Sequence, residues 1–118
     1  MRFKRAAKVF VTGLTVEAEI GLWSDEQGRR QTLHIDVELD IAGNSWRHLS
    51  DTVNYELVVS HAQEIAAGGH IGLVETFAQR LADACLAESQ VVKARVRVEK
   101  PGALAHALAT VEVTACKP

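Results

Sequence analysis

Hydrophobic and polar residues alternate in two long stretches of the first third of the chain. Between residues 10 and 21 the apolar positions fall on every second residue, which predicts a half-buried strand. These positions are Leu14, Val16, Ala18 and Ile20. Gly13 interrupts the stretch and predicts a bulge or bend. From Leu33 to Ile41 every odd-numbered residue is apolar and every even-numbered one is polar, which is the strongest strand signal in the chain.

The spacing becomes helical in the middle of the chain. After a polar, turn-rich segment at residues 43–53, apolar residues recur at helical intervals from Tyr55 until the Gly68-Gly69 pair stops them. A second helix is predicted after these glycines. Its apolar stripe comprises Leu73, Val74, Phe77, Leu81, Ala84 and Cys85.

Alternation returns in the last third of the chain and predicts two more strands. The first has Val92, Ala94, Val96 and Val98 on one face, and Pro101-Gly102 breaks it. The second has Val111, Val113 and Ala115 on one face. The order ββααββ predicts an α+β fold with a four-stranded, mainly antiparallel sheet and both helices on one face. The first two strands form a hairpin around Gly28, and the free edges of such a sheet favour association into a ring.

Composition narrows the class of protein. The 118 residues include 13 Lys+Arg and 15 Asp+Glu, a formal charge of −2, and we expect one domain over residues 1–118 with a flexible tail at 1–7. The basic residues form no patch beyond the first five positions, which argues against nucleic-acid binding. No apolar run is long enough for a membrane span, and we expect a cytoplasmic protein. Cys85 and Cys116 are interpreted as buried, reduced thiols.

Most familiar catalytic motifs are missing from the sequence. It has neither a Gly-x-Ser-x-Gly elbow nor a glycine-rich phosphate loop. Its histidines lack the spacing of a metal site, so we expect no bound metal and interpret each histidine as a surface or packing residue. They are His34, His48, His61, His70 and His106.

Lys100 occupies an unusual position for a lysine. It shares the parity of Val96 and Val98, so a strand that keeps its register directs the lysine to the apolar face. One interpretation is that the strand ends at Glu99 and the lysine reaches water past Pro101. The other is an ammonium whose pKa is lowered by partial desolvation, so that it serves as a base or proton relay.

Two other polar residues lie at helix starts. Glu75 falls in the first turn of the second helix, where the helix dipole and free N–H groups favour a carboxylate. This placement indicates either simple stabilisation of the helix start or a carboxylate that accepts two parallel N–H bonds from a ligand. Tyr55, the only tyrosine, lies at the start of the first helix, where a packing role is the simpler interpretation.

Four segments, in this order and spacing, resemble the dihydroneopterin aldolases of folate biosynthesis. They read GLWSDE at residues 21–26, DTVNY at 51–55, LVE at 73–75 and KPGA at 100–103. The resemblance extends from about Val9 to Ala115. It implies the tunnelling fold, in which the sheets of several copies close into a barrel. It also implies a homo-oligomer, a tetramer or an octamer, with active sites between subunits.

The resemblance further implies the reaction and the catalytic residues. The substrate would be a small pterin, 7,8-dihydroneopterin, cleaved to 6-hydroxymethyl-7,8-dihydropterin and glycolaldehyde. No cofactor is implied, because the C6=N5 imine of the substrate can accept the released electrons. By resemblance, Lys100 deprotonates the 2′-hydroxyl and Glu26 holds the surrounding network, although Asp25 is an adjacent alternative. Tyr55 from a neighbouring subunit assists protonation of the intermediate.

Pterin recognition is implied for a second group of residues. Glu75, aided by backbone groups around Leu73 and Val74, would hold the N2/N3 edge of the ring, and Val53 would also contact substrate. Two alternatives stay open. A dihydroneopterin triphosphate epimerase would use the same ring contacts and place basic side chains near the substrate's side chain, with Arg29, Arg30 and Arg47 as candidates. A non-catalytic binding or assembly module would not require Lys100.

Overall fold

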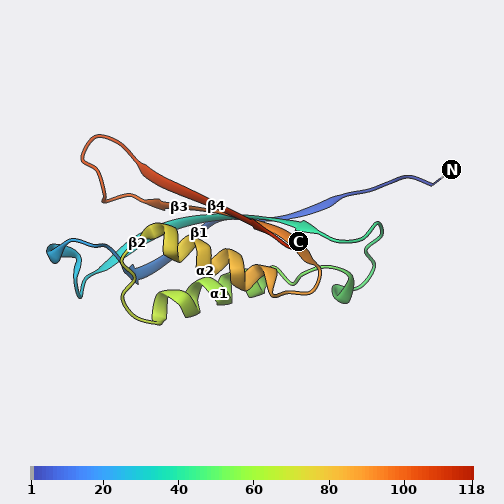
Figure 1. The fold of residues 1–118 in the computed structure, drawn as a ribbon, viewed down its shortest axis with the longest axis horizontal. Helices are drawn as coiled ribbons and strands as arrows, with labels where there is room; N and C mark the ends of the chain where they lie inside the picture. Colours follow the sequence, from blue (N-terminus) through green and yellow to red (C-terminus); the bar gives the residue numbers. More distant parts are fainter. Residues whose placement is uncertain (1) are drawn as a thin grey trace.

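The computed structural model describes residues 2–118, which form a sheet covered on one face by two helices (Figure 1). This confirms the predicted order and fold class. The described elements are β1 (Ala7–Glu19), β2 (Arg30–Ile41), α1 (Glu56–Ala67), α2 (Val74–Leu86), β3 (Val91–Lys100) and β4 (Ala109–Cys116), with short 3-10 helices η1 (Ser24–Glu26) and η2 (Leu49–Asp51).

Each strand pairs with the next one along the chain, so the sheet order is β1-β2-β3-β4 and every pairing is antiparallel. This order leaves β1 and β4 as the two edges of the sheet. The core lies between the sheet and the helices, where the alternating residues of β2 meet the apolar stripe of α2. Phe77, Leu33, Ile35, Leu39 and Leu81 are among its fully buried side chains.

Gly13 is a bulge, as the sequence predicts. Its φ is +71°, and the register with β2 shifts between Val11 and Leu14. Before the bulge the odd-numbered residues of β1 face the core, as Val9 does opposite Leu39. After the bulge the even-numbered residues face the core. Because the bulge switches the parity, the alternation seen from residue 10 onward did not reveal that β1 begins at Ala7.

The predicted inward position of Val92 is wrong. Val92 is 38% exposed, whereas Val91 is fully buried. The register between β2 and β3 shifts at this point, so that Lys93 lies opposite Asp40 while Val91 lies opposite Ile41. Val92 is the extra residue of this irregularity and turns outward.

The face of the sheet opposite the helices carries charged side chains arranged in pairs across the strands. Lys8 donates to Asp40 at 2.6 Å, and Arg95 lies 3.2 Å from Glu38 and 3.8 Å from Glu112. Opposite charges that face each other across strands stabilise the pairing modestly. This face is therefore polar and the helix-covered face apolar, as the alternation predicts.

The two cysteines differ in environment. Cys85 is buried in α2, and this burial, together with nearby Glu88, raises the pKa of its thiol to about 12. The expectation that Cys116 is buried is wrong, because this residue is exposed. Cys116 ends β4 one position beyond Ala115, so it points to the opposite face of the sheet from the core.

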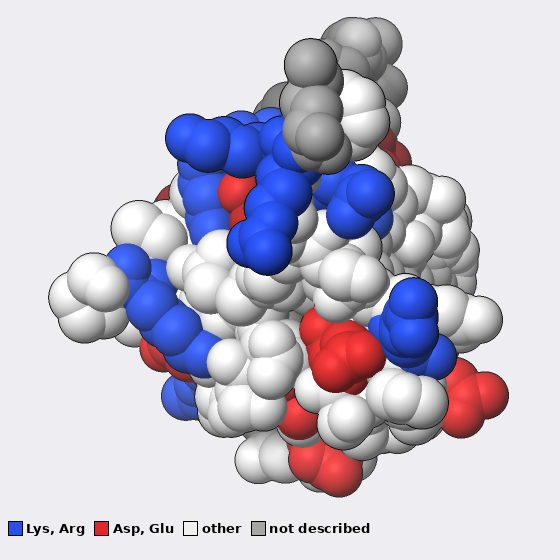
Figure 2. Space-filling model, turned by 90° about the vertical axis from the view of Figure 1, so that its right-hand side faces the viewer, with Lys and Arg blue, Asp and Glu red and all other residues white. Residues whose placement is uncertain are grey.

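Figure 2 shows the end of the molecule that carries the N-terminus, where Lys and Arg side chains gather above several acidic ones. Arg5 is held here by Asn44, which accepts bonds from its main-chain N–H at 2.6 Å and from its guanidinium at 3.1 Å. Residue 1 lies outside the described residues, and the flexibility expected for residues 1–7 stays a prediction. No helix among residues 2–118 is long and apolar enough to cross a membrane.

Candidate active site

Lys100 lies on the helix-covered face, at the far end of β3. The strand keeps its register through this residue, which pairs with Ala109 of β4, and the lysine side chain is only 11% exposed. The interpretation in which the strand ends at Glu99 is therefore wrong. An inward-pointing ammonium at the end of a sheet needs a partner, because burial of an unpaired charge is costly.

The partner is Glu26, the last residue of η1. Its carboxylate contacts the Lys100 ammonium and also accepts bonds from the Gln31 side-chain amide at 2.9 Å and from the Trp23 main-chain N–H at 3.2 Å. These bonds, led by the one from Lys100, lower the pKa of Glu26 to about 2 although the residue is buried. The carboxylate therefore supplies the partner that the inward-pointing lysine needs.

The carboxylate of Glu26 lies directly against the backbone of Gly21. A Cβ atom at position 21 would overlap the carboxylate, and Gly21 has a φ of +127°. Only glycine combines this conformation with this close approach. Asp25, the neighbouring alternative, is exposed and makes no contact with Lys100 among the described residues, so the structure pairs the lysine with Glu26.

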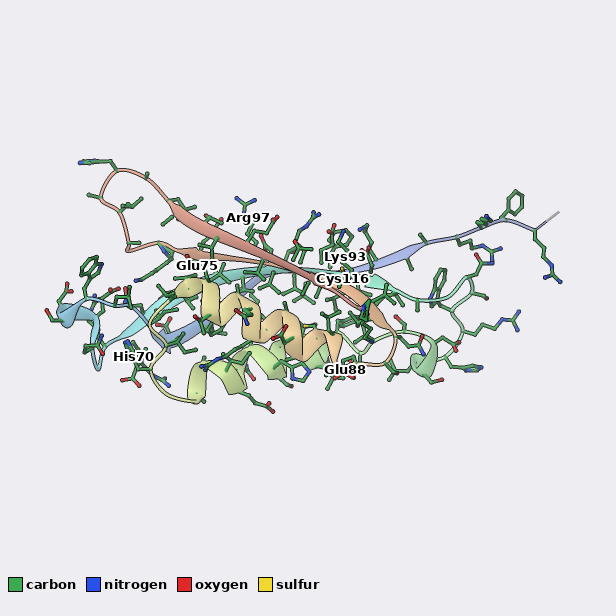
Figure 3. The ribbon with its side chains drawn as sticks, viewed as in Figure 1. His70, Glu75, Glu88, Lys93, Arg97 and Cys116 are labelled. Carbon is green, nitrogen blue, oxygen red and sulfur yellow. The ribbon has the colours of Figure 1, made fainter. Side chains whose placement is uncertain are left out.

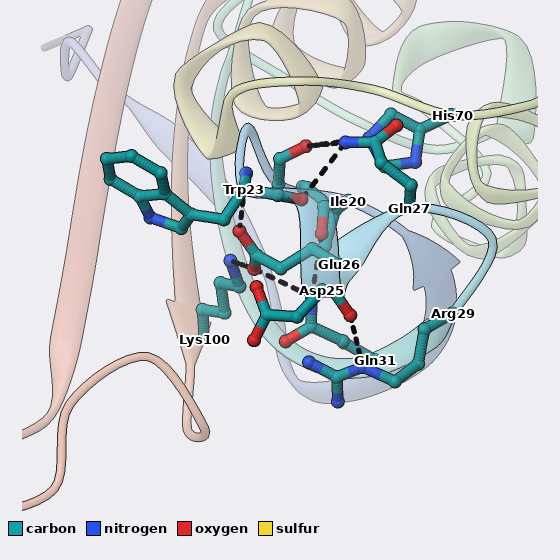
Figure 4. A network of polar contacts seen from close by, with 10 residues as sticks. Ile20, Trp23, Asp25, Glu26, Gln27, Arg29, Gln31, His70 and Lys100 are labelled. Atoms are coloured by element: carbon teal, nitrogen blue, oxygen red, sulfur yellow. Dashed lines mark hydrogen bonds and ion pairs between the residues drawn. The ribbon is translucent and has the colours of Figure 1, made fainter.

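Side-chain contacts to the backbone hold the whole segment around Glu26 in place (Figure 4). The Gln31 amide donates to the carbonyl of Ile20 at 2.6 Å, and the Gln27 amide donates to that of Gly21 at 3.2 Å. The His70 ring lies 2.7 Å from the same Gly21 carbonyl. The loop is thus tied to the end of β1 and to the segment that precedes α2.

This segment brings the start of α2 to the same place. Ile71 accepts a bond from Gly21 N–H at 3.0 Å and donates one to the Glu19 carbonyl at 2.9 Å. Glu75 follows in the first turn of α2 and is exposed. Figure 3 shows Glu75 and His70 at the end of the molecule opposite the N-terminus. The first N–H groups of α2 have no partners within the helix and face the same region.

A cavity of about 240 Å³ lies between these groups. Glu26, Lys100 and Glu75 all line it, and most of the remaining wall is apolar. The other lining residues are Gly21, Leu22, Trp23, Gly72, Leu73, Val74, Val98, Ala103, Ala109 and Val111. An ion pair and a separate carboxylate in the wall of one largely apolar cavity can bind a flat polar ring and move a proton at its edge.

Tyr55 and Val53 do not reach this cavity. With Val9, Leu49, Thr52, Asn54 and Glu56 they line a separate hollow of about 330 Å³ near the free edge of β1. Tyr55 precedes α1, whereas Glu75 follows the other end of this 12-residue helix, which is about 18 Å long. Tyr55 is 62% exposed. A single chain therefore brings together five of the seven expected site residues, and Tyr55 and Val53 are not among them.

The arginines considered for an epimerase also lie elsewhere. Arg29 and Arg30 line another hollow beside Pro101 and Gly102, and no arginine of residues 2–118 lines the cavity with Lys100. Arg47 lies beside η2, where its N–H donates to Asp51 at 2.9 Å. Within the described part of the chain, no three His, Cys, Asp or Glu side chains are grouped to hold a metal ion.

The sequence did not reveal Gln31 and Trp23, which bond to the Glu26 carboxylate, nor Gln27, which bonds only to the backbone of the loop. Gln31 did carry a signal: it shares the parity of Leu33 and Ile35, so its polar side chain points to the apolar face of the sheet just as Lys100 does. Trp23 acts through its main-chain N–H and Gln27 through contacts with backbone carbonyls. Contacts of this kind depend on the loop conformation and leave no pattern in the sequence.

The fold and the cavity define a class: an α+β chain whose four-stranded antiparallel sheet carries two helices on one face, with a largely apolar cavity at its end that an ion pair and a carboxylate line. Comparison with known proteins gives the family. The family model of dihydroneopterin aldolase matches residues 9–116, and the chain belongs to this family. A dihydroneopterin aldolase of Escherichia coli is 32% identical over 111 residues, covering 84% of each chain.

Solved structures of the same family are similar throughout. The E. coli dihydroneopterin aldolase in complex with neopterin is 26% identical, with a TM-score of 0.80 over 92% of this chain and 98% of that one. A dihydroneopterin aldolase from Burkholderia thailandensis bound to guanine is 27% identical, with a TM-score of 0.79 over 96% of this chain and 93% of that one. These neighbours confirm the single-chain architecture of the tunnelling fold, a four-stranded antiparallel sheet with two helices on one face. The closure of several sheets into a barrel stays a prediction.

Proposed function

We propose that this protein cleaves 7,8-dihydroneopterin by a retro-aldol reaction to 6-hydroxymethyl-7,8-dihydropterin and glycolaldehyde. The observation that carries the proposal is the buried Glu26–Lys100 ion pair, which lines the same largely apolar cavity as Glu75. Family membership supports it. Neopterin and guanine, which occupy related structures, share a 2-amino-4-oxopyrimidine edge, and this edge is what the cavity of the present chain would recognise.

Glu75 would bind that edge. An ionised carboxylate can accept two parallel bonds from the 2-amino group and the N3–H of the pterin. Glu75 lies in the first turn of α2, and the main-chain groups of Leu73 and Val74, which line the same cavity, would bind the carbonyl side of the ring. The apolar side chains of the cavity wall would cover the two faces of the ring.

Lys100 and Glu26 would carry out the proton transfer. Transfer of the 2′-hydroxyl proton to Lys100, directly or through a water molecule, allows the C1′–C2′ bond to break and glycolaldehyde to leave. The electron pair of that bond moves to C1′ and is delocalised onto N5 through the C6=N5 imine. Protonation of C1′ restores the imine and completes the hydroxymethyl product, so protons and electrons balance.

Independence from metals and cofactors is part of the proposal. The substrate itself supplies the electron sink, because its imine plays the part that a Schiff base or a metal-bound carbonyl plays in other aldolases. The ammonium of Lys100 lies beside a carboxylate, an arrangement suited to shuttling protons. Proton transfer of this kind forms no covalent bond between Lys100 and the substrate, so no imine with the lysine is part of the proposal.

The complete site would lie between two copies of the chain. The cavity with Lys100 reaches the free edge of the sheet at Ala109 and Val111 of β4, and the hollow with Tyr55 reaches the other free edge at Val9 of β1. Pairing β4 of one copy with β1 of the next would satisfy both edges and bring the two hollows together. Repetition of this contact closes a barrel, as a tetramer or as an octamer of two rings.

The proposal is tested by incubating the purified protein with 7,8-dihydroneopterin and, separately, with its triphosphate, and separating the products by chromatography. An aldolase releases glycolaldehyde and the hydroxymethyl pterin from the first substrate. An epimerase instead converts the triphosphate to its 2′-epimer without releasing glycolaldehyde. A module that only binds pterins leaves both compounds unchanged, and either of these last two results overturns the proposal.

A further inference from the structure

We infer that Gln31 is a positioning residue of the active site, which holds the Glu26 carboxylate in the orientation and ionisation state that the Glu26–Lys100 pair needs. The inference rests on the proposed function for its kinetic consequences. Its geometric basis is independent of the reaction, because it concerns a contact between two side chains of this chain. Gln31 does not line the cavity itself, so it would act through Glu26 and not on the substrate.

The geometry points to a specific role for the Gln31 amide. One nitrogen, Nε2, donates to the Ile20 carbonyl at 2.6 Å and to Oε2 of Glu26 at 2.9 Å. The two hydrogens of a primary amide can serve both acceptors at once. The same oxygen, Oε2, receives the Lys100 ammonium. Gln31 therefore links Oε2, the Glu26 oxygen that contacts Lys100, to the backbone at the end of β1.

The carboxylate has few other donors. Its second oxygen, Oε1, accepts the Trp23 main-chain N–H at 3.2 Å, and the absence of a side chain at Gly21 leaves room for the group. Hydrogen bonds to a carboxylate favour its charged form, and the Gln31 bond is the second-largest cause of the low pKa of Glu26. The titratable and charged groups around this carboxylate are Lys100 of β3, Glu75 of α2, Asp25 and Arg29 of its own loop, and His70 from the segment before α2.

Gln27 provides a matched control within the same loop. Its amide donates to the carbonyls of Gly21 and Trp23 at 3.2 and 3.3 Å and makes no bond to Glu26. Gln27 and Gln31 are thus the same residue type, each joined to the loop backbone, but only Gln31 also contacts the catalytic carboxylate. A loss of loop stability affects both variants, whereas a loss of Glu26 positioning affects one.

The first experiment compares Gln31→Met with Gln27→Met, each of which removes an amide and keeps the length of the side chain. We expect Gln31→Met to lower kcat roughly tenfold, the lower end of what one lost charge-assisted bond produces, with little change in KM because Glu75 still binds the ring. Gln27→Met should keep kcat within about twofold. Circular dichroism and light scattering establish that both variants are folded and equally assembled.

The second experiment uses pH to switch the contact within one protein. In Gln31→Glu the introduced carboxyl, when protonated, can still donate to Glu26, and when ionised it repels Glu26. Two carboxyl groups that share one site are forced apart in pKa, so we expect kcat relative to wild type to fall as the pH rises through a midpoint between about 5 and 7. A purely structural role of Gln31 gives no such pH-dependent ratio.

A third measurement needs no substrate. The titration of Glu26, followed by NMR of its labelled carboxyl carbon, should have a midpoint about one pH unit higher in Gln31→Met than in Gln27→Met. Equal midpoints in the two variants overturn the inference. A Gln31→Met enzyme with the wild-type kcat, or a Gln31→Glu enzyme with the wild-type pH profile, overturns it as well. If the wild-type protein has no aldolase activity, the proposed function fails, and the NMR titration still decides the role of Gln31.

Discussion

The Glu26 carboxylate and the Lys100 ammonium are in direct contact although 74 residues separate them in the chain. Their side chains are only 8% and 11% exposed. The contact joins the loop between β1 and β2 to the end of β3, the strand that pairs with β2. A buried ion pair is weak evidence for stability, since the cost of desolvation offsets much of the attraction. Its retention at the wall of a cavity is instead consistent with a role in proton transfer.

Replacement of Lys100 by alanine should remove chemistry and spare binding. A positioned acid–base group contributes about 10² to 10⁴ in rate, so single-turnover cleavage by Lys100→Ala should slow by this factor while the Kd of the product pterin changes little. Lys93→Ala, on the same strand but away from the cavity, serves as the control and should keep full activity. Equal losses of binding and turnover in Lys100→Ala would assign the lysine a structural role.

Replacement of Glu75 should have the opposite signature. Glu75→Ala would remove two charge-assisted bonds that contribute about 1.5–3 kcal/mol each. The Kd of 6-hydroxymethyl-7,8-dihydropterin should therefore rise at least about 100-fold. Isothermal titration measures this directly. Asp83→Ala changes an exposed carboxylate on the same helix and should bind normally. A Glu75→Ala protein with the affinity of wild type would leave Glu75 as a residue that only stabilises the start of α2.

The low pKa of Glu26 makes a prediction about acid stability. Its pKa falls from 4.5 to about 2 on folding, so the carboxylate stabilises the folded chain above the unfolded value and loses this contribution as the pH falls toward 2. The full contribution is roughly 3 kcal/mol. Glu26→Gln lacks it, and the difference in unfolding free energy from wild type should shrink steadily between pH 5 and pH 2. Denaturant unfolding at fixed protein concentration measures it, and a constant difference would contradict the assignment.

Complementation tests whether sites form between copies of the chain. Lys100→Ala and Tyr55→Phe should each be nearly inactive as pure oligomers. After dissociation, mixing and reassociation, some interfaces join an intact Lys100 to an intact Tyr55, and these should recover activity. A fully active monomer by light scattering, or verified mixed oligomers that stay inactive, would rule out a shared site.

Much of this fold could be predicted because alternation along a strand reports which face is buried. The strict pattern from Leu33 to Ile41 located β2, and the parity of Lys100 placed its side chain on the core face. The same rule failed where the backbone departs from regular pairing. The Gly13 bulge hid the first residues of β1, and the irregularity opposite Ile41 reversed Val91 and Val92. A change of one residue in register exchanges the two faces.

The candidate site was predictable only in part, for a related reason. The residues that lie on regular elements, such as Lys100 and Glu75, stand out because a charged group occupies an unexpected position. Asp25 and Glu26 are adjacent carboxylates with the same chemistry. Which of them reaches Lys100 depends on the conformation of η1, and the sequence does not determine this. Tyr55 and Val53 line a hollow of their own, so their distance from Lys100 in a complete site depends on how copies of the chain assemble. The hydrophobic periodicity of one chain carries no information about that assembly.

The central claim is that the bond broken is C1′–C2′ and that C1′ is then protonated by the enzyme. Cleavage of 7,8-dihydroneopterin in deuterium oxide tests it most directly. We predict one carbon-bound deuterium at the hydroxymethyl carbon of the pterin product, seen by NMR, and one molecule of glycolaldehyde with an undeuterated aldehyde carbon for each pterin formed. A hydroxymethyl carbon without deuterium, or pterin formed without an equal amount of glycolaldehyde, would contradict the retro-aldol reaction at this site.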